Sequence, residues 1–136
     1  MGTWGPGAFD NDHAADFAGT LDTLPAEQHV EVITRVLEAV VAPGNNTGTG
    51  VTDPAVAAAA VIASQLPGGS PTDPIYGPEK PSPPLPRALV PLAVRALDRI
   101  VAPDSEVKEL WAESPEDQPW HDGIDALRRV LTAQRP

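Results

Sequence analysis

Residues 53–66, DPAVAAAAVIASQL, decide the fold of this chain, because they carry its strongest helical signal. Asp53 is a good N-cap residue, and Pro54 suits the first helical position, where no backbone amide is needed. The Pro-Gly-Gly at 67–69 ends the helix. Small alanine side chains let neighbouring helices approach closely. We therefore expect this helix at the centre of the molecule, with other helices packed around it.

Helical periodicity accounts for much of the chain on both sides of this stretch. Apolar residues recur at helical spacing after the cap candidates Asp10–Asp12, after Pro25 and from Leu89 onward. The three stripes are Ala14, Phe17, Ala18 and Leu21; Val30, Ile33, Leu37, Val40 and Val41, ended by Pro43 and Gly44; and Leu89, Leu92, Ala93, Ala96, Leu97 and Ile100, where Pro91 marks a kink or a start. Residues 44–50, GNNTGTG, are expected to form a loop.

Two further helices are expected near the C-terminus. Ser105 is expected to cap EVKELWAES, with Val107, Leu110 and Trp111 on one side. A variant capping box of Ser114 and Asp117 opens the last helix. Its stripe is Trp120, Ile124, Leu127 and Leu131. No window alternates with a period of two, so strands are not expected. We predict an all-α fold, an irregular bundle of five to six short helices, in one domain spanning residues 1–136.

A long proline-rich loop is predicted over residues 67–86, which hold eight prolines. Proline lacks the amide that a helix or an interior strand requires. Loops of this length in compact domains are usually functional or disordered. Two readings follow, a stiff strap that crosses the bundle and a segment that binds a partner.

Composition excludes several classes of protein. Nine basic and 19 acidic residues give a net charge of -10, which repels nucleic acid and anionic membrane surfaces. The absence of cysteine excludes disulfides, cysteine nucleophiles and thiolate metal sites. No apolar run approaches the roughly 20 residues of a membrane span, and no signal-peptide pattern opens the chain. We therefore expect a cytoplasmic protein with no membrane or nucleic acid partner.

The opening string MGTWGPGAFDNDHAADF, together with DPAVAAAAVIASQL and ALDRIVAPDSEVKELWAES, resembles a bacterial family called domain of unknown function 4259. The resemblance extends over nearly the whole chain. Pro6 and Ala8 depart from the family string, in which a Thr-Gly-Pro order is commoner. The resemblance implies little about activity, because the family is uncharacterised.

The opening string has a structural interpretation. Gly2, Gly5 and Gly7 are expected to adopt positive φ, so that Trp4 turns inward and pins a chain end that would otherwise fray. Asp10, Asn11 and Asp12 would then satisfy the free amides at the start of the first helix. This interpretation predicts a buried indole and a rigid acidic rim behind it.

Several side chains are candidates for chemistry. Asp12 and Asp16 share a helix face and repel each other unless a cation lies between them, either Arg95 or Arg99, a partner's basic group, or a metal. The pairs His13 with Asp16 and His121 with Asp125 could supply metal ligands or acid–base catalysis. His29 is expected at the boundary of the second stripe. Neither a phosphate-binding loop nor a serine-hydrolase motif occurs.

Three functions remain open. We favour a binding protein, similar in kind to immunity proteins and antitoxins, that neutralises or regulates a basic protein partner. Its candidate contacts are the proline-rich loop and two groups of acidic residues: Asp10, Asp12 and Asp16 near the N-terminus, and Glu109, Glu113 and Asp117 within the acidic segment from Glu106 to Asp125. The alternatives are an enzyme that uses histidine and aspartate, with Asp12, Asp16 and His13 as the metal candidates, and a structural domain that oligomerises. No cofactor is expected.

Overall fold

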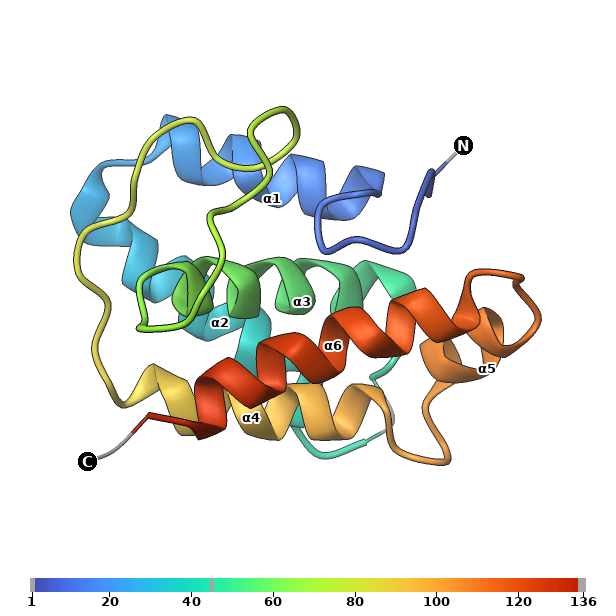
Figure 1. Ribbon diagram of the computed structural model, residues 1–136. Coiled ribbons are helices and arrows are strands. Elements are labelled where there is room, and N and C mark those ends of the chain that lie inside the picture. Colours follow the sequence, from blue (N-terminus) through green and yellow to red (C-terminus); the bar gives the residue numbers. More distant parts are fainter. Residues whose placement is uncertain (1, 45, 135–136) are drawn as a thin grey trace.

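Six α-helices and one short 3-10 helix account for most of the described chain (Figure 1). The computed structural model describes residues 2–44 and 46–134. The elements are α1 (Asp12–Thr23), η1 (Ala26–Gln28), α2 (His29–Val41), α3 (Thr49–Ser64), α4 (Leu89–Ile100), α5 (Glu106–Ala112) and α6 (Asp117–Thr132). These residues contain no strand, and an isolated bridge joins Thr3 to Asn11. The prediction of an all-α fold is therefore confirmed.

Helix α3 lies at the centre of the bundle, as its alanines predicted. It packs against α1, α2, α4 and α6, and Figure 1 shows α1 above it and α4 below it. Five of its alanines are at most 2% exposed: Ala55, Ala57, Ala58, Ala59 and Ala63. Because these side chains are small, four helices approach one helix on several sides.

The start of α3 differs from the prediction. The helix begins at Thr49 after the N-cap Gly48, so the predicted loop at 44–50 contributes its last two residues to the helix. Asp53 is therefore not a cap but lies one turn inside the helix, directly before Pro54. Contacts with α5 hold this first turn in place, because Thr47 accepts hydrogen bonds from the amides of Glu106 and Val107 at 2.8 and 2.9 Å. Tertiary contacts thus extend the helix beyond the cap that local sequence favours.

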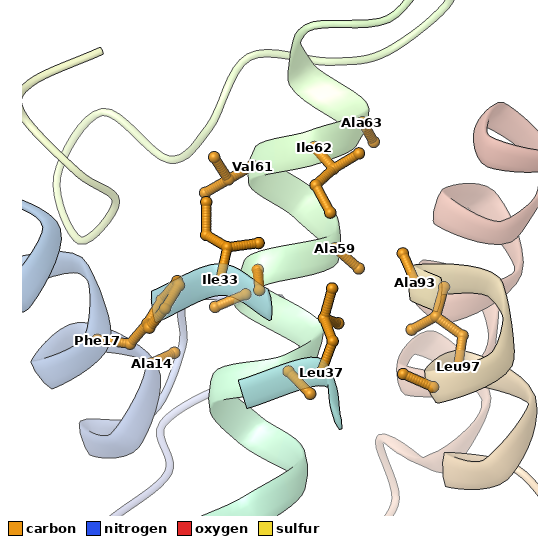
Figure 2. Close-up of a cluster of buried hydrophobic side chains, with 14 of the residues drawn as sticks. Ala14, Phe17, Ile33, Leu37, Ala59, Val61, Ile62, Ala63, Ala93 and Leu97 are labelled. Carbon is orange, nitrogen blue, oxygen red and sulfur yellow. The ribbon is translucent and has the colours of Figure 1, made fainter. Parts of the chain in front are cut away.

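Apolar side chains from the surrounding helices fill the space around α3 (Figure 2). Ala14 and Phe17 reach it from α1, and Ala93 and Leu97 from α4. The stripe predicted for α2 is buried at Ile33, Leu37 and Val40, each 0% exposed. The periodicity of α1, α2 and α4 therefore identified the faces that enter the core.

The chain between α3 and α4, residues 65–88, contains neither helix nor strand. Its backbone is bonded to distant side chains. The carboxylate of Asp22 in α1 accepts from the amides of Glu79 and Lys80 at 3.0 and 2.8 Å. The Gln65 amide donates to the carbonyls of Ser82 and Pro83 and accepts from the amide of Leu85. These bonds tie the segment to α1 and to the end of α3.

The N-terminal segment is anchored, but not by Trp4. The Trp4 side chain is 45% exposed, so the predicted burial of this indole is wrong. Its ring packs against Tyr76, with centroids 5.0 Å apart. The segment is held instead by its backbone, because the amides of Trp4 and Asp12 donate to the carbonyls of Asp10 and Gly2 at 2.9 and 2.7 Å. Phe9, only 4% exposed, is the aromatic residue that enters the core.

Glycine serves a different purpose in this turn than the one predicted. Among the described residues, positive φ occurs only at Gly44 and Gly68. Gly5 and Gly7 are needed for space, since a Cβ at either would lie 2.6 or 2.7 Å from Oδ2 of Asp10. The turn therefore closes around the Asp10 carboxylate and leaves no room for side chains there.

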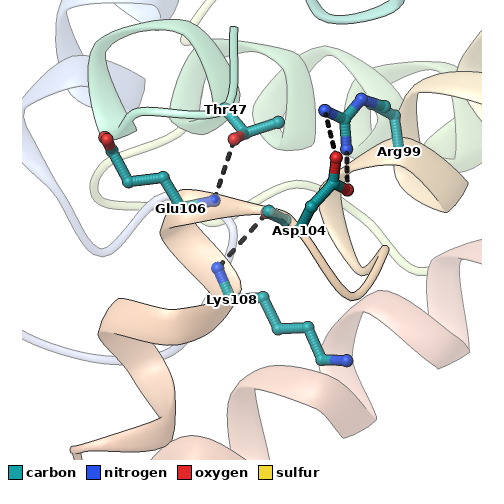
Figure 3. Close-up of polar contacts among 6 residues, drawn as sticks. Thr47, Arg99, Asp104, Glu106 and Lys108 are labelled. Atoms are coloured by element: carbon teal, nitrogen blue, oxygen red, sulfur yellow. Dashed lines mark hydrogen bonds and ion pairs between the residues drawn. The ribbon is translucent and has the colours of Figure 1, made fainter. Parts of the chain in front are cut away.

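The two predicted helix starts near the C-terminus have different outcomes. Ser105 caps α5 as predicted, and its Oγ accepts from the amide of Lys108 (Figure 3). The capping box before α6 does not form, because Oγ of Ser114 accepts from the amide of Glu116 instead. Helix α6 begins at Asp117 without a side-chain cap. Leu110, which was expected on the apolar side of α5, is 58% exposed.

Candidate functional site

The two aspartates of α1 carry unpaired charge at the surface. Asp12 and Asp16 are both exposed, and no ion pair within the described residues includes either of them. The expected compensation by Arg99 is wrong, because its guanidinium binds Asp104 at 2.9 Å (Figure 3). Arg95 is exposed on α4 and pairs with neither aspartate in this part of the chain. The negative charge of this face therefore remains available to an external group.

Asp10 has a structural role within the N-terminal turn. Its Oδ2 accepts the amide of Gly7 at 2.9 Å, inside the turn that Gly5 and Gly7 leave open. The neighbouring Asn11 is the N-cap of α1, and its Oδ1 accepts from the amide of Ala14 at 2.8 Å. Of the three cap candidates, Asn11 therefore performs the capping.

The acidic residues near the C-terminus differ in their surroundings. Glu109 and Glu113 are exposed on and just after α5. Asp117 is partly buried at the start of α6, with Oδ1 3.4 Å from Nε2 of His121. His121 thus faces the aspartate four residues before it and not Asp125, and its ring packs edge-on against Trp120.

The histidines do not assemble into a metal site. His29 is buried with Nδ1 2.9 Å from Oγ of Ser82 and Nε2 3.3 Å from the Leu24 carbonyl, so both ring nitrogens have structural partners. His13 is exposed on α1. Across residues 2–44 and 46–134, no three side chains of His, Asp or Glu come close enough together to hold a metal ion.

A groove of about 650 Å³ follows α3 and α6. Asp53, Val56, Ala60 and Ala63 of α3 form one side, and Trp120, Ile124, Leu127 and Val130 of α6 form the other. Residues 6–11 of the N-terminal turn and residues of the 67–73 segment complete the lining. Most of this lining is apolar. The groove has the size and character common to small-molecule sites.

Asp53 is the unusual residue in this groove. It is 9% exposed and makes no hydrogen bond or ion pair with any other residue that the structure describes. Burial raises the pKa of its carboxyl group from 3.8 to about 6, and the nearby His13 charge lowers that pKa in part. A buried carboxylate without partners is costly and is often found at functional sites.

Sequence reasoning missed Asp53 as a site residue because Asp followed by Pro is a common helix start. No local signal identified it, because residues 49–52 are Thr-Gly-Val-Thr, which are weak helix formers, and the helix nevertheless begins at Thr49. Trp111 and Trp120 were assigned to separate stripes, yet their rings stack in parallel with centroids 5.8 Å apart, and both line the groove.

Comparison with protein families supports the resemblance noted in the sequence. Residues 2–123 match the model of the family described as Domain of unknown function (DUF4259). The chain belongs to the DUF4259 family. No curated protein matches it, and no solved structure matches it. None of the helices described combines the length and apolar character needed to cross a bilayer.

DUF4259 is described as a domain of unknown function, so membership in this family assigns no activity to the chain. The opening string of the chain now has a physical explanation, because Gly5, Gly7 and Asp10 close the turn and Phe9 fills the core. The same turn forms one wall of the groove. Function must therefore be argued from the exposed carboxylates and from the groove itself.

Proposed function

We propose that this DUF4259 protein binds a basic protein partner through the exposed carboxylates of α1 and α5, and so neutralises or regulates that partner. The observation that supports this proposal is the free charge of Asp12, Asp16, Glu109 and Glu113. All four are exposed, and none takes part in an ion pair within the described chain. Asp10 and Asp117 are less available, since each has an internal contact.

Charge of this kind acts mainly on association. A net charge of -10 over 136 residues gives a negative field that steers a basic partner toward the surface. Exposed ion pairs are each worth at most about 1 kcal/mol, so several must act together. Because the Debye length is only about 8 Å at physiological salt, binding of this type weakens as ionic strength rises.

The test uses a panel of basic peptides of known sequence, each with at least five net positive charges, titrated against the intact protein at 50 mM salt. Two double variants, Asp12→Asn with Asp16→Asn and Glu109→Gln with Glu113→Gln, remove two charges each. The matched control, Glu27→Gln with Glu38→Gln, removes two exposed charges from η1 and α2.

We expect the tightest peptides to lose at least tenfold in affinity with one or both site variants and less than twofold with the control. Equal losses in all three variants would mean that the peptides respond only to net charge, and the proposed surface would be rejected. Absence of binding to any peptide at 50 mM salt would also overturn the proposal.

A further inference from the structure

The groove along α3 and α6 presents one chemical asymmetry. Its sides are apolar, formed by residues such as Val56, Ile124 and Leu127, yet the buried carboxylate of Asp53 lies at one end. The lining residues of α3 run from Asp53 to Ala63. At a rise of 1.5 Å per residue, this side of the groove is about 15 Å long. The shape is therefore elongated, with the unpaired polar group at one end.

We propose that this groove binds a small organic cation with an elongated apolar body, whose protonated amine is held by the carboxylate of Asp53. The inference is independent of the basic protein partner proposed above, because it concerns a different surface and a different class of ligand.

Charge complementarity identifies the cation. No basic side chain of the described residues lies within 4 Å of the Asp53 carboxylate. Arg129 also lines the groove, but its side chain is exposed and forms no ion pair with Asp53. An ammonium group at Asp53 would supply the missing partner, whereas an anion would meet Asp53 and Asp10 at the same end.

Aromatic rings strengthen this assignment. Trp120, Phe9 and Trp111 line the groove together with Asp53 and Asn11. Trp120 and Phe9 are 5% and 4% exposed, so their rings form fixed apolar walls. Indole faces attract ammonium groups, so a cation should bind more tightly here than a neutral analogue of the same shape.

The groove lies beside groups that titrate, so its pH dependence can be stated. His13 of α1 acts on Asp53, and Asp10, Asp73 and Arg129 are the other charged residues that line the groove. Because burial raises the pKa of Asp53 to about 6, its carboxylate is fully charged only above that pH. Amine binding should therefore strengthen from pH 5 to pH 7.5, where alkylamines remain protonated.

The experiment follows the tryptophan fluorescence of the full chain with Trp4 replaced by Phe, which leaves Trp111 and Trp120 as reporters in the groove. Octylammonium, octanol and octanoate are titrated at concentrations below micelle formation. We expect octylammonium to bind at least tenfold more tightly than either analogue at pH 7.5. Equal binding of all three would show an unselective apolar surface and would overturn the proposal.

Two variants test the location of the site. Asp53→Asn should abolish the preference for octylammonium over octanol, whereas Asp12→Asn, the same charge change on the exposed face of α1, should preserve it. Gly123→Phe should weaken all ligands at least tenfold, because Gly123 lines the groove and a Cβ there meets nothing within 4 Å. An unchanged preference in Asp53→Asn, with circular dichroism showing a folded protein, would overturn the assignment.

If Asp53→Asn does not fold, Gly123→Phe decides the question. Unchanged octylammonium affinity in folded Gly123→Phe would place binding elsewhere and reject the groove. Binding of basic peptides to the groove, detected as competition with octylammonium, would replace the small-molecule proposal with a peptide site.

Discussion

Replacing Asp53 by Asn should stabilise the protein at neutral pH and leave it unchanged in acid. The pKa of Asp53 rises from 3.8 to about 6 because the group is buried. The folded state therefore keeps the Asp53 proton up to a higher pH than the unfolded state does. The contribution of Asp53 to the free energy of unfolding is most favourable below pH 3.8 and is lost as the pH rises through about 6. At 1.36 kcal/mol per unit, the ionised carboxylate costs the folded protein about 3 kcal/mol. Asn has nearly the same shape and carries no charge, so the variant should avoid this cost.

The assay is urea unfolding, followed by tryptophan fluorescence, of the native protein and Asp53→Asn from pH 4 to pH 8. The difference in free energy of unfolding should be near zero at pH 4, rise by about 1.4 kcal/mol per pH unit and level off at about 3 kcal/mol above pH 6.5. Asp12→Asn is the control, because Asp12 is exposed and its replacement should give a difference that is small at every pH. A difference that stays constant with pH would refute the reasoning, since it would show that Asp53 titrates alike in the folded and unfolded chain.

Three further predictions concern the helices, and each is measured by the same unfolding assay at pH 7. Asn11→Ala should cost about 1 kcal/mol, because the Asn11 side chain caps α1 at 2.8 Å, and no change would show that the cap is dispensable. Gly19→Ala should stabilise by about 0.5–1 kcal/mol, because Gly19 is exposed within α1 and its added Cβ has open space; a loss would reveal a hidden contact. Leu37→Ala should cost about 3–5 kcal/mol, because Leu37 is 0% exposed where α2 packs against α3, and a cost below 1 kcal/mol would contradict a close-packed core.

Periodicity was enough to predict the helices and their buried faces. The buried residues of α1 are the predicted stripe, Ala14, Phe17, Ala18 and Leu21. An amphipathic helix is most stable when its single apolar face is packed against the core. The alanines of α3 correctly indicated a central position, since residues that small stabilise a fold mainly by letting other helices approach. Both inferences use only the spacing and the size of the apolar residues, which can be read from the sequence.

Predictions that depended on tertiary contacts were less successful. Trp4 was expected to be buried because the glycines around it were to turn the indole inward and pin the chain end, but backbone hydrogen bonds anchor the turn and leave the ring against Tyr76. Asp53 was expected to be a cap because its local sequence favours one, but α5 holds Thr47 and extends the helix upstream. For Asp53 the deciding contact comes from α5, which is distant in sequence, and for Trp4 the ring contact comes from Tyr76, and no local pattern identifies either partner.

The structural role of the opening string also bears on the groove. Residues 6–11 line the groove, and the absence of side chains at Gly5 and Gly7 lets the Asp10 carboxylate lie against this turn. Phe9 follows within the same turn and fixes that wall against the core. The string that marks the family therefore shapes the cavity in which Asp53 lies, although it contributes few of the side chains proposed to bind. The glycines of the signature thus act on the backbone beside the groove, whereas the carboxylate proposed to bind an amine comes from α3.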